Sequence, residues 1–169
     1  MKTFRANGKL LISGEYTILD GSLSLALPTH KGQVLHYKEV DQDILHWRSL
    51  NLKGETWFEA FFHGAELAIK DSSDDRKAES LKEILLAASK LSEKVNFLKG
   101  EVTTALEFPT FWGLGSSSTL ICCIAQCFDI DAMQLHFQVS NGSGYDVACG
   151  MTDSAITYQL DDGLVEVNQ

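Results

Sequence analysis

The sequence lacks any apolar run close to the roughly 20 residues that a helix needs to cross a bilayer. Its opening, Met1–Lys9, lacks the apolar segment of a signal peptide. We therefore expect a cytoplasmic protein that does not bind membranes. Proline is scarce, with 2 residues against 13 glycines, while hydrophobic residues make up 44% of the 169-residue chain. This composition excludes collagen-like, low-complexity and wholly disordered chains, and the length suits one domain with a sizeable core.

Positive charge is also in short supply. The chain has 14 Lys and Arg against 23 Asp and Glu, a formal net charge of −9 and a pI near 4.9. An acidic surface repels the phosphate backbone of nucleic acids, so we expect no nucleic-acid partner. A local anion site stays open, because backbone dipoles can build one without net positive charge.

Cysteine pairs of the CxxC type are absent, and no two histidines have zinc-finger spacing. Three of the four cysteines, Cys122, Cys123 and Cys127, lie in one apolar stretch, and Cys149 stands alone. Cys123 and Cys127 are one helical turn apart and could share a metal, but we favour packed core thiols. The sequence also lacks the G-x-S-x-G and H-E-x-x-H motifs of hydrolases and metalloproteases.

The first half of the chain reads mainly as strands, followed by one clear helix. β-branched and aromatic residues predict strands at Lys9–Ser13, at Leu23–Leu27 (ending at Pro28), and in an antiparallel meander of Gln33–Tyr37, Ile44–Leu50 and Thr56–Phe62. A helix then follows Ser72–Asp74, with Ser73 or Asp74 as its cap. Its apolar positions recur in steps of three and four: Ala78, Leu81, Ile84, Leu85, Ala88 and Leu91.

The second half alternates irregularly between strands and helices. We expect a strand at Val102–Phe108 ended by Pro109, a buried helix at Thr119–Phe128, and a short helical piece at Ala132–Gln138. The strands Ala155–Leu160 and Leu164–Val167 should form a hairpin with an Asp162-Gly163 turn. This pattern predicts an α+β fold rather than a doubly wound sheet.

The segment Gly113-Leu114-Gly115-Ser116-Ser117-Ser118, here called the glycine–serine turn, could hold a phosphate. Two glycines let the backbone approach a ligand, and the serines occupy the cap and first turn of a helix, where free N–H groups and the helix dipole favour anions. Taken alone, the segment fits a serine-capped helix after a glycine turn at least as well. It is neither a Walker A loop nor a dinucleotide fingerprint.

Two other segments carry polar residues between glycines. Lys9 and Glu15 lie on one strand-and-turn unit, flanked by Gly8 and Gly14. Asp146 follows the turn Gly142-Ser143-Gly144, where a rigidly held carboxylate could accept a proton. Each has an ordinary alternative, since the first pair fits surface charges beside turns and Asp146 could cap a short helix.

Together and in this order, the three segments resemble the three-part signature of the GHMP kinases, which include galactokinase, homoserine kinase, mevalonate kinase and phosphomevalonate kinase. Gly8-Lys9 through Gly14-Glu15 to Gly21 resembles the first motif. Pro109 to Ser118 resembles the second, the phosphate loop, which is the most specific of the three. Gly142-Ser-Gly-Tyr-Asp-Val-Ala148 resembles the Ser-Gly-x-Asp segment and is close to a bacterial subgroup named for Gly-Tyr-Asp-Ile-Ala.

The resemblance implies a fold and a reaction. The fold would be the family's N-terminal domain, similar to ribosomal protein S5 domain 2, with a mixed or antiparallel sheet and helices packed on one face. The reaction would transfer the γ-phosphoryl group of ATP to a hydroxyl or phosphate of a small molecule, of mevalonate-like, sugar or amino-acid type. ATP and Mg²⁺ would be the cofactors and the small-molecule acceptor the partner.

The resemblance also assigns roles by position. Gly113, Leu114, Gly115, Ser116, Ser117 and Ser118 would bind the nucleotide phosphates, with Ser117 facing Mg²⁺. Asp146 would be the catalytic base, and Lys9 would pair with it and with the acceptor oxygen. Glu15, Ser143 and Gly144 would lie at or near the site. The stretch Met133–Gln138, where mevalonate kinase supplies a glutamate to the metal, contains no carboxylate.

The resemblance covers residues 1–169 as a single N-terminal, ATP-binding domain, whereas family members are about twice as long and have a C-terminal domain that is absent here. Because half of the cleft would be missing, turnover by this 169-residue form is an open question. The alternative is a catalytically incomplete binding or assembly module that keeps the fold. In that case a homodimer could form through the face left bare by the missing domain.

Overall fold

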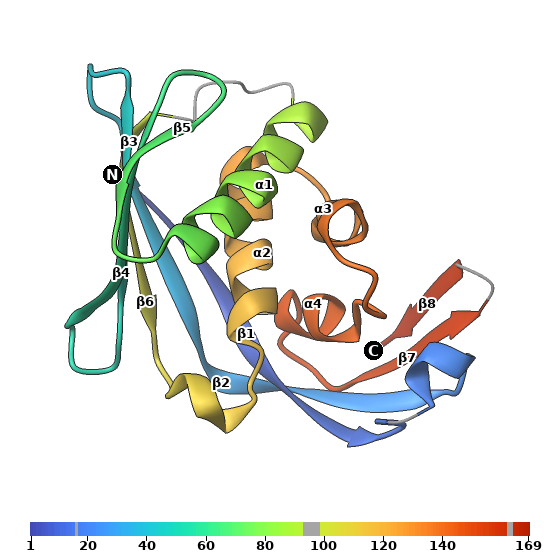
Figure 1. Ribbon diagram of the computed structural model, residues 1–169. Helices are drawn as coiled ribbons and strands as arrows, with labels where there is room; N and C mark the ends of the chain where they lie inside the picture. Colours follow the sequence, from blue (N-terminus) through green and yellow to red (C-terminus); the bar gives the residue numbers. More distant parts are fainter. Residues whose placement is uncertain (16, 93–98, 162–163) are drawn as a thin grey trace.

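The computed structural model describes residues 1–15, 17–92, 99–161 and 164–169. These residues form one mixed eight-stranded sheet with helices packed on one face, which agrees with the predicted α+β class (Figure 1). The strands are β1 (Lys2–Ser13), β2 (Ser24–Lys38), β3 (Ile44–Leu50), β4 (Thr56–His63), β5 (Ala68–Ser72), β6 (Gly100–Leu106), β7 (Ile156–Asp161) and β8 (Leu164–Asn168). The helices are α1 (Asp75–Leu91), α2 (Ser116–Phe128), α3 (Ala132–Val139) and α4 (Tyr145–Gly150), with short 3-10 turns η1 (Ile18–Asp20) and η3 (Thr110–Trp112).

The long strand β2 is the centre of the sheet. One edge pairs with β1 along most of its length, while the other pairs first with β7 and then with β6. The prediction that Pro28 ends a strand is wrong, because β2 continues through it and Pro28 pairs with Lys9. Pro28 lies between the β7 and β6 pairings, where β1 is the partner of β2 within the described ranges. A residue without an N–H is tolerated where one edge of a strand is unpaired.

Strand β6 lies between β2 and β3, so the predicted meander is only partly correct. β3 and β4 do pair antiparallel, but β3 pairs with β6 in parallel. A parallel neighbour needs a crossover connection, and here β4, β5 and α1 provide it between Leu50 and Gly100. The β7–β8 hairpin is confirmed by its register, and the proposed Asp162-Gly163 turn lies outside the described residues.

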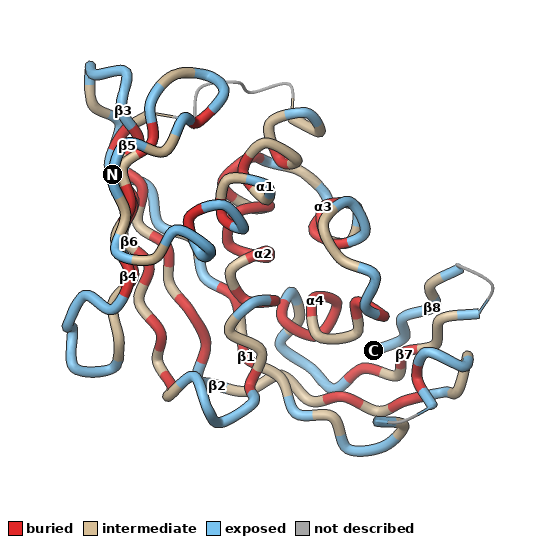
Figure 2. Tube along the Cα trace, viewed as in Figure 1, coloured by how far each residue is buried: buried red, intermediate tan, exposed pale blue. Residues whose placement is uncertain are grey.

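The core fills the space between the sheet and the helices, as Figure 2 shows. Helix α1 is capped by the Asp74 side chain, which accepts from the Lys77 amide at 3.1 Å, and it buries the predicted stripe at Ala78, Leu81, Leu85 and Ala88. Helix α2 is apolar on nearly every side because it lies between the sheet and the other helices. All four cysteines are free and buried, and no helix of the described residues is long and apolar enough to cross a membrane.

The buried thiols and phenols should make the protein sensitive to alkali. Burial raises the pKa of Cys149 from 9.0 to about 11 and that of Cys123 and Cys127 to about 12. Above pH 9 the unfolded chain therefore loses thiol protons that the native chain keeps, and the free energy of unfolding falls as pH rises. Urea unfolding under reducing conditions should show a loss of about 1 kcal/mol per buried thiol between pH 9 and 10.

A Cys149→Ala variant provides the control for this dependence. Removing one buried thiol should reduce the loss between pH 9 and 10 by that thiol's contribution, about 1 kcal/mol. Unfolding energies that stay level between pH 8 and 10 in the parent protein would contradict the assignment.

Candidate functional site

The glycine–serine turn leads from η3 into α2. Gly113 and Gly115 both have left-handed backbones, with φ of +69° and +82°. A Cβ on Gly115 would lie 2.4 Å from the Ser118 hydroxyl, so both space and conformation require glycine there. The first helical bond of α2 runs from the Thr119 amide to the Gly115 carbonyl at 2.9 Å. The three preceding amides therefore have no intrahelical acceptor and lie at the positive end of the helix dipole.

The three serines of the turn differ in exposure. Ser117 is exposed and Ser116 is half-buried, so both hydroxyls are accessible from the same side of the helix start. Ser118 is buried, and its hydroxyl donates to the Gly115 carbonyl at 2.9 Å. Its side chain therefore stabilises the turn, and only its amide faces the helix end. Leu114 is buried and its carbonyl accepts from the Lys9 amide at 3.0 Å.

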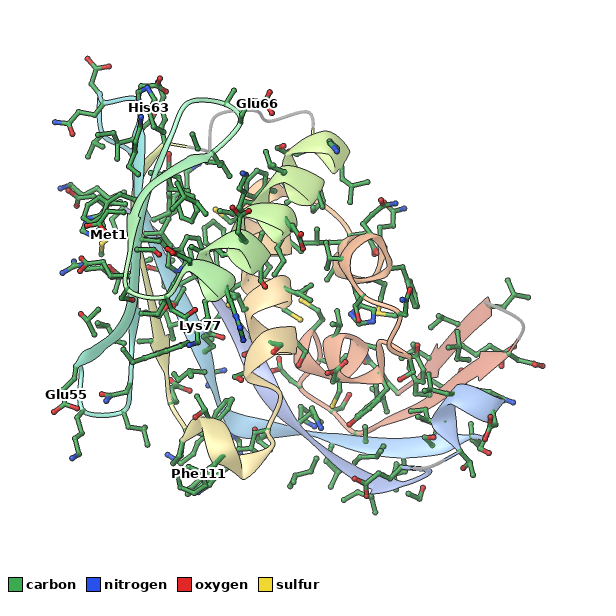
Figure 3. All side chains as sticks on the ribbon, in the orientation of Figure 1. Met1, Glu55, His63, Glu66, Lys77 and Phe111 are labelled. Atoms are coloured by element: carbon green, nitrogen blue, oxygen red, sulfur yellow. The ribbon has the colours of Figure 1, made fainter. Side chains whose placement is uncertain are left out.

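A cavity of about 1040 Å³ opens beside Ser116 and Ser117. Its walls come from β3, β4, the start of α1, and η3, and they include the aromatic side chains Trp47 and Trp57. Figure 3 labels three residues that line it: Glu55 in the β3–β4 loop, Lys77 in α1 and Phe111 in η3. The described lining residues carry three cations, Lys53, Arg76 and Lys77, and one carboxylate, Glu55. Since Lys77 also pairs with Asp74, the mouth has a small local excess of positive charge on a chain whose net charge is −9.

Lys9 lies on the other side of the glycine–serine turn. Carbons of its side chain come within 3.4 Å of the position where a Cβ on Gly115 would be. Its ammonium group donates to the hydroxyl of Tyr145 at 2.7 Å. The Lys9 side chain thus reaches from the start of α2 to the start of α4.

Asp146 lies in the first turn of α4. Gly144, with a φ of +81°, is the residue that begins this helix, and the half-buried Asp146 carboxylate accepts from the Val147 amide at 3.0 Å. The charges of Lys9 and Asp146 both act on the pKa of the Cys149 thiol, although burial is the largest influence on it. Lys9 bonds to Tyr145, the residue directly before Asp146, so Lys9 reaches the same turn of α4 that carries this carboxylate.

The expected pairing of Lys9 with Asp146 is replaced in the structure by the bond to Tyr145. Among the described residues, no ion pair joins the Lys9 ammonium to the Asp146 carboxylate. Glu15 lies exposed in the turn after β1 and makes no hydrogen bond or ion pair with the described residues. Tyr145 is a site residue that sequence reasoning missed, although it lies inside the third motif.

The cavity walls were also missed. Trp47, Trp57 and Lys77 belong to three elements, and only the pairing of the sheet and the packing of α1 bring them to one place. Tryptophans at strand positions and a lysine in the first turn of a helix carry no local signal of a ligand. By contrast, the glycine–serine turn carries its signal in consecutive residues.

The described residues hold no group of three His, Cys, Asp or Glu side chains that could hold a metal ion. Mg²⁺ is commonly held by one or two carboxylates together with substrate phosphates and water. The exposed Ser117 hydroxyl at the helix start fits a metal that arrives with a phosphate ligand. It does not fit a resident ion held by protein groups alone.

No family model matches the sequence, and no curated protein matches it. Solved structures do. Lactococcus lactis galactokinase, solved with galactose, superposes with a TM-score of 0.73 at 16% identity, over 99% of this chain and 46% of that one. Streptococcus pneumoniae phosphomevalonate kinase, solved with phosphomevalonate and AMPPNP, gives 0.71 at 17% identity, over 100% of this chain and 59% of that one. L. major mevalonate kinase, solved with R-mevalonate, gives 0.63 at 12%, over 99% and 52%.

The likeness establishes the fold, which is that of the N-terminal domain of GHMP-family kinases, as the sequence motifs predict. The chain spans about half the length of the solved structures that it matches.

Proposed function

We propose that this chain is the N-terminal, ATP-binding domain of a GHMP-type small-molecule kinase, which transfers the γ-phosphoryl group of ATP to a hydroxyl or phosphate acceptor. The observation that carries the proposal is the Lys9 side chain, which contacts the region of Gly115 and bonds to Tyr145. Three segments far apart in the sequence thereby meet along one lysine side chain. This arrangement supports the interpretation that the three motifs form one site and are not three unrelated turns.

The nucleotide would lie in the cavity, with its phosphates at the start of α2. A volume of about 1040 Å³ is slightly above the roughly 300–1,000 Å³ typical of small-molecule sites, which leaves room for a nucleotide. The exposed Trp57 offers apolar area for a base, with the buried Trp47 behind it in the cavity wall, and the amides of Ser116 and Ser117 offer donors to phosphate oxygens. Lys53, Arg76 and Lys77 give the mouth the charge that attracts a polyanion to an otherwise acidic protein.

Ser117 would contribute a ligand to Mg²⁺, together with phosphate oxygens and water. When bound, the metal would neutralise charge on the phosphates. The remaining roles in the transfer would be carried out by side chains of the protein. Asp146 would accept the proton of the acceptor hydroxyl as the acceptor oxygen bonds to the γ-phosphorus. The bond to the bridging oxygen breaks, and its electron pair leaves with ADP. Lys9 would add positive charge beside the transferred group, and the Tyr145 hydroxyl would hold the ammonium in place.

A catalytically incomplete binding or assembly module is the second candidate. It is favoured by exposed apolar side chains at one end of the sheet: Leu10 and Ile12, both on one face of β1, and Leu19 and Leu23 around η1. Such side chains would suit an interface between two copies of the chain. A dimer by light scattering that does not bind MgATP would favour this module.

Titration with MgATP tests the kinase proposal directly. Trp47 and Trp57 line the cavity and Trp112 lies in η3 beside it, so all 3 tryptophans of the protein are placed to report binding. We expect a saturable change in fluorescence with millimolar MgATP and a rise in Tm, equivalent to roughly 2.7 kcal/mol at a hundredfold excess over Kd. Inorganic phosphate at the same ionic strength is the control. Equal responses to both ligands, or none to MgATP, would overturn the proposal.

A further inference from the structure

The turn Gly142–Gly144, directly before α4, is held by two buried side chains from different elements. The Nε2 of His136, on α3, lies 3.1 Å from the Gly142 carbonyl oxygen. The hydroxyl of Tyr158, on β7, donates to the next carbonyl, that of Ser143. Consecutive carbonyl groups of one turn are therefore fixed from two sides of the molecule.

Burying the imidazole of His136 at this position costs free energy, because one of its ring nitrogens has no partner within the described ranges. His136 is 5% exposed and packs against Gly142 and Gly144. Since a carbonyl oxygen only accepts, Nε2 carries the hydrogen, and Nδ1 is left with a lone pair. Among the described residues Nδ1 has no hydrogen-bond partner, although it is buried. A leucine would fill the same space without an unsatisfied polar atom, so what the histidine adds is its bond to the turn.

Tyr158 reaches the same turn from the sheet. Its side chain is fully buried, and burial, followed by the negative charge of Asp146, raises its pKa to about 12. The phenol keeps its proton at neutral pH and donates it to the Ser143 carbonyl.

The turn itself determines where Asp146 lies. Gly144 begins α4 in a left-handed conformation, and a Cβ there would meet the Met133 side chain at 2.6 Å and the His136 ring at 3.1 Å. Helix α4 has only 6 residues, too few to be stable by itself. Its last four residues are held by burial in the core, and its first turn is held by the Gly142–Gly144 turn. Asp146 is two residues beyond Gly144.

We propose that His136 and Tyr158 are positioning residues that hold the carbonyl groups of Gly142 and Ser143 and thereby fix Asp146 for proton acceptance. This inference rests on the kinase function proposed above for Asp146. Neither side chain touches the reacting atoms, and both act through the turn.

Tyr158→Phe tests the proposal, with Tyr37→Phe as its matched control. Tyr37 is also buried, its pKa is also raised to about 12, and its hydroxyl donates to a backbone carbonyl, that of Lys99 at 2.9 Å, on β2 away from α4. In the full chain, with MgATP and phosphate release to water as the assay, Tyr158→Phe should lower kcat about tenfold or more at an unchanged KM. Tyr37→Phe should lower Tm similarly and leave kcat unchanged. Equal kcat in the two variants would overturn the proposal.

A second comparison separates positioning from packing at His136. His136→Gln keeps an N–H donor near the place of Nε2, whereas His136→Leu keeps only the volume of the side chain. The glutamine variant should therefore have a kcat close to that of the parent protein, and the leucine variant should have a lower kcat. Hydrogen exchange over residues 144–150 should be faster in Tyr158→Phe and His136→Leu than in Tyr37→Phe. If the parent protein neither binds nor hydrolyses MgATP, the kinase proposal fails. The exchange rates then decide the inference alone, and equal rates in all three variants would overturn it.

Discussion

Replacing Asp146 with asparagine should reduce phosphoryl transfer by about 10²- to 10⁴-fold, the usual contribution of a general base, while MgATP affinity changes by less than about twofold. Asparagine has the same shape and keeps an oxygen that can accept from the Val147 amide, so the start of α4 is preserved. Only the capacity to accept a proton is lost. The measurement is initial-rate kinetics across a panel of small alcohols and phosphate monoesters, with MgATP binding measured in parallel.

Asp41→Asn is the matched control for this variant. Asp41 is exposed in the turn between β2 and β3, and its replacement removes the same charge from the protein. It should transfer phosphate at the parent rate. Turnover by Asp146→Asn that equals turnover by Asp41→Asn would remove Asp146 from the mechanism and leave the fold assignment untouched.

Gly115→Ala should lower MgATP affinity at least about tenfold, equivalent to roughly 1.4 kcal/mol. Alanine is strained at a φ of +82°, and its Cβ would lie 2.4 Å from the Ser118 hydroxyl, which is bonded to the Gly115 carbonyl. The first turn of α2 must shift to relieve that contact, and the amides of Ser116 and Ser117 shift with it. Titration calorimetry with MgATP measures the loss.

Gly64→Ala separates the effect on the site from the general cost of a left-handed alanine. Gly64 has a φ of +70°, nothing lies within 4 Å of an added Cβ, and it belongs to the connection between β4 and β5. Both variants should lose about 1–2 kcal/mol of stability from backbone strain. Only Gly115→Ala should lose affinity for MgATP, and equal affinities would exclude the α2 start as the phosphate site.

The fold was predictable where its signal is local. The stripe of α1, the glycine–serine turn and the β7–β8 hairpin are each written in consecutive residues, and the structure has all three. The position of β6 in the sheet could not be predicted, because it depends on pairing with β2 and β3, which are more than 50 residues away in the sequence. For the same reason the prediction that a strand ends at Pro28 was wrong, since a strand tolerates proline where one of its edges is unpaired.

The candidate site shows the same contrast between residues with a local sequence signal and residues without one. Lys9, Gly115 and Asp146 were predicted from their motifs, and in the structure the Lys9 side chain lies beside Gly115 and bonds to Tyr145, the neighbour of Asp146. The partner of the Lys9 ammonium, Tyr145, and the side chains behind the turn, His136 and Tyr158, were missed. A histidine in a short helix and a tyrosine in a hairpin have no sequence signal, because their meaning depends on the carbonyl groups they meet.

The position of β6 has a consequence for how the protein is made. Until residue 106 has left the ribosome, β2 and β3 each present an unpaired edge, and buried side chains such as Leu35 and Trp47 have no finished sheet to cover. The strands β2 and β3 can therefore join into one sheet only after β6 has been made. Nascent chains that stall before this point would expose unpaired strand edges, which promote aggregation and are the kind of surface that chaperones protect.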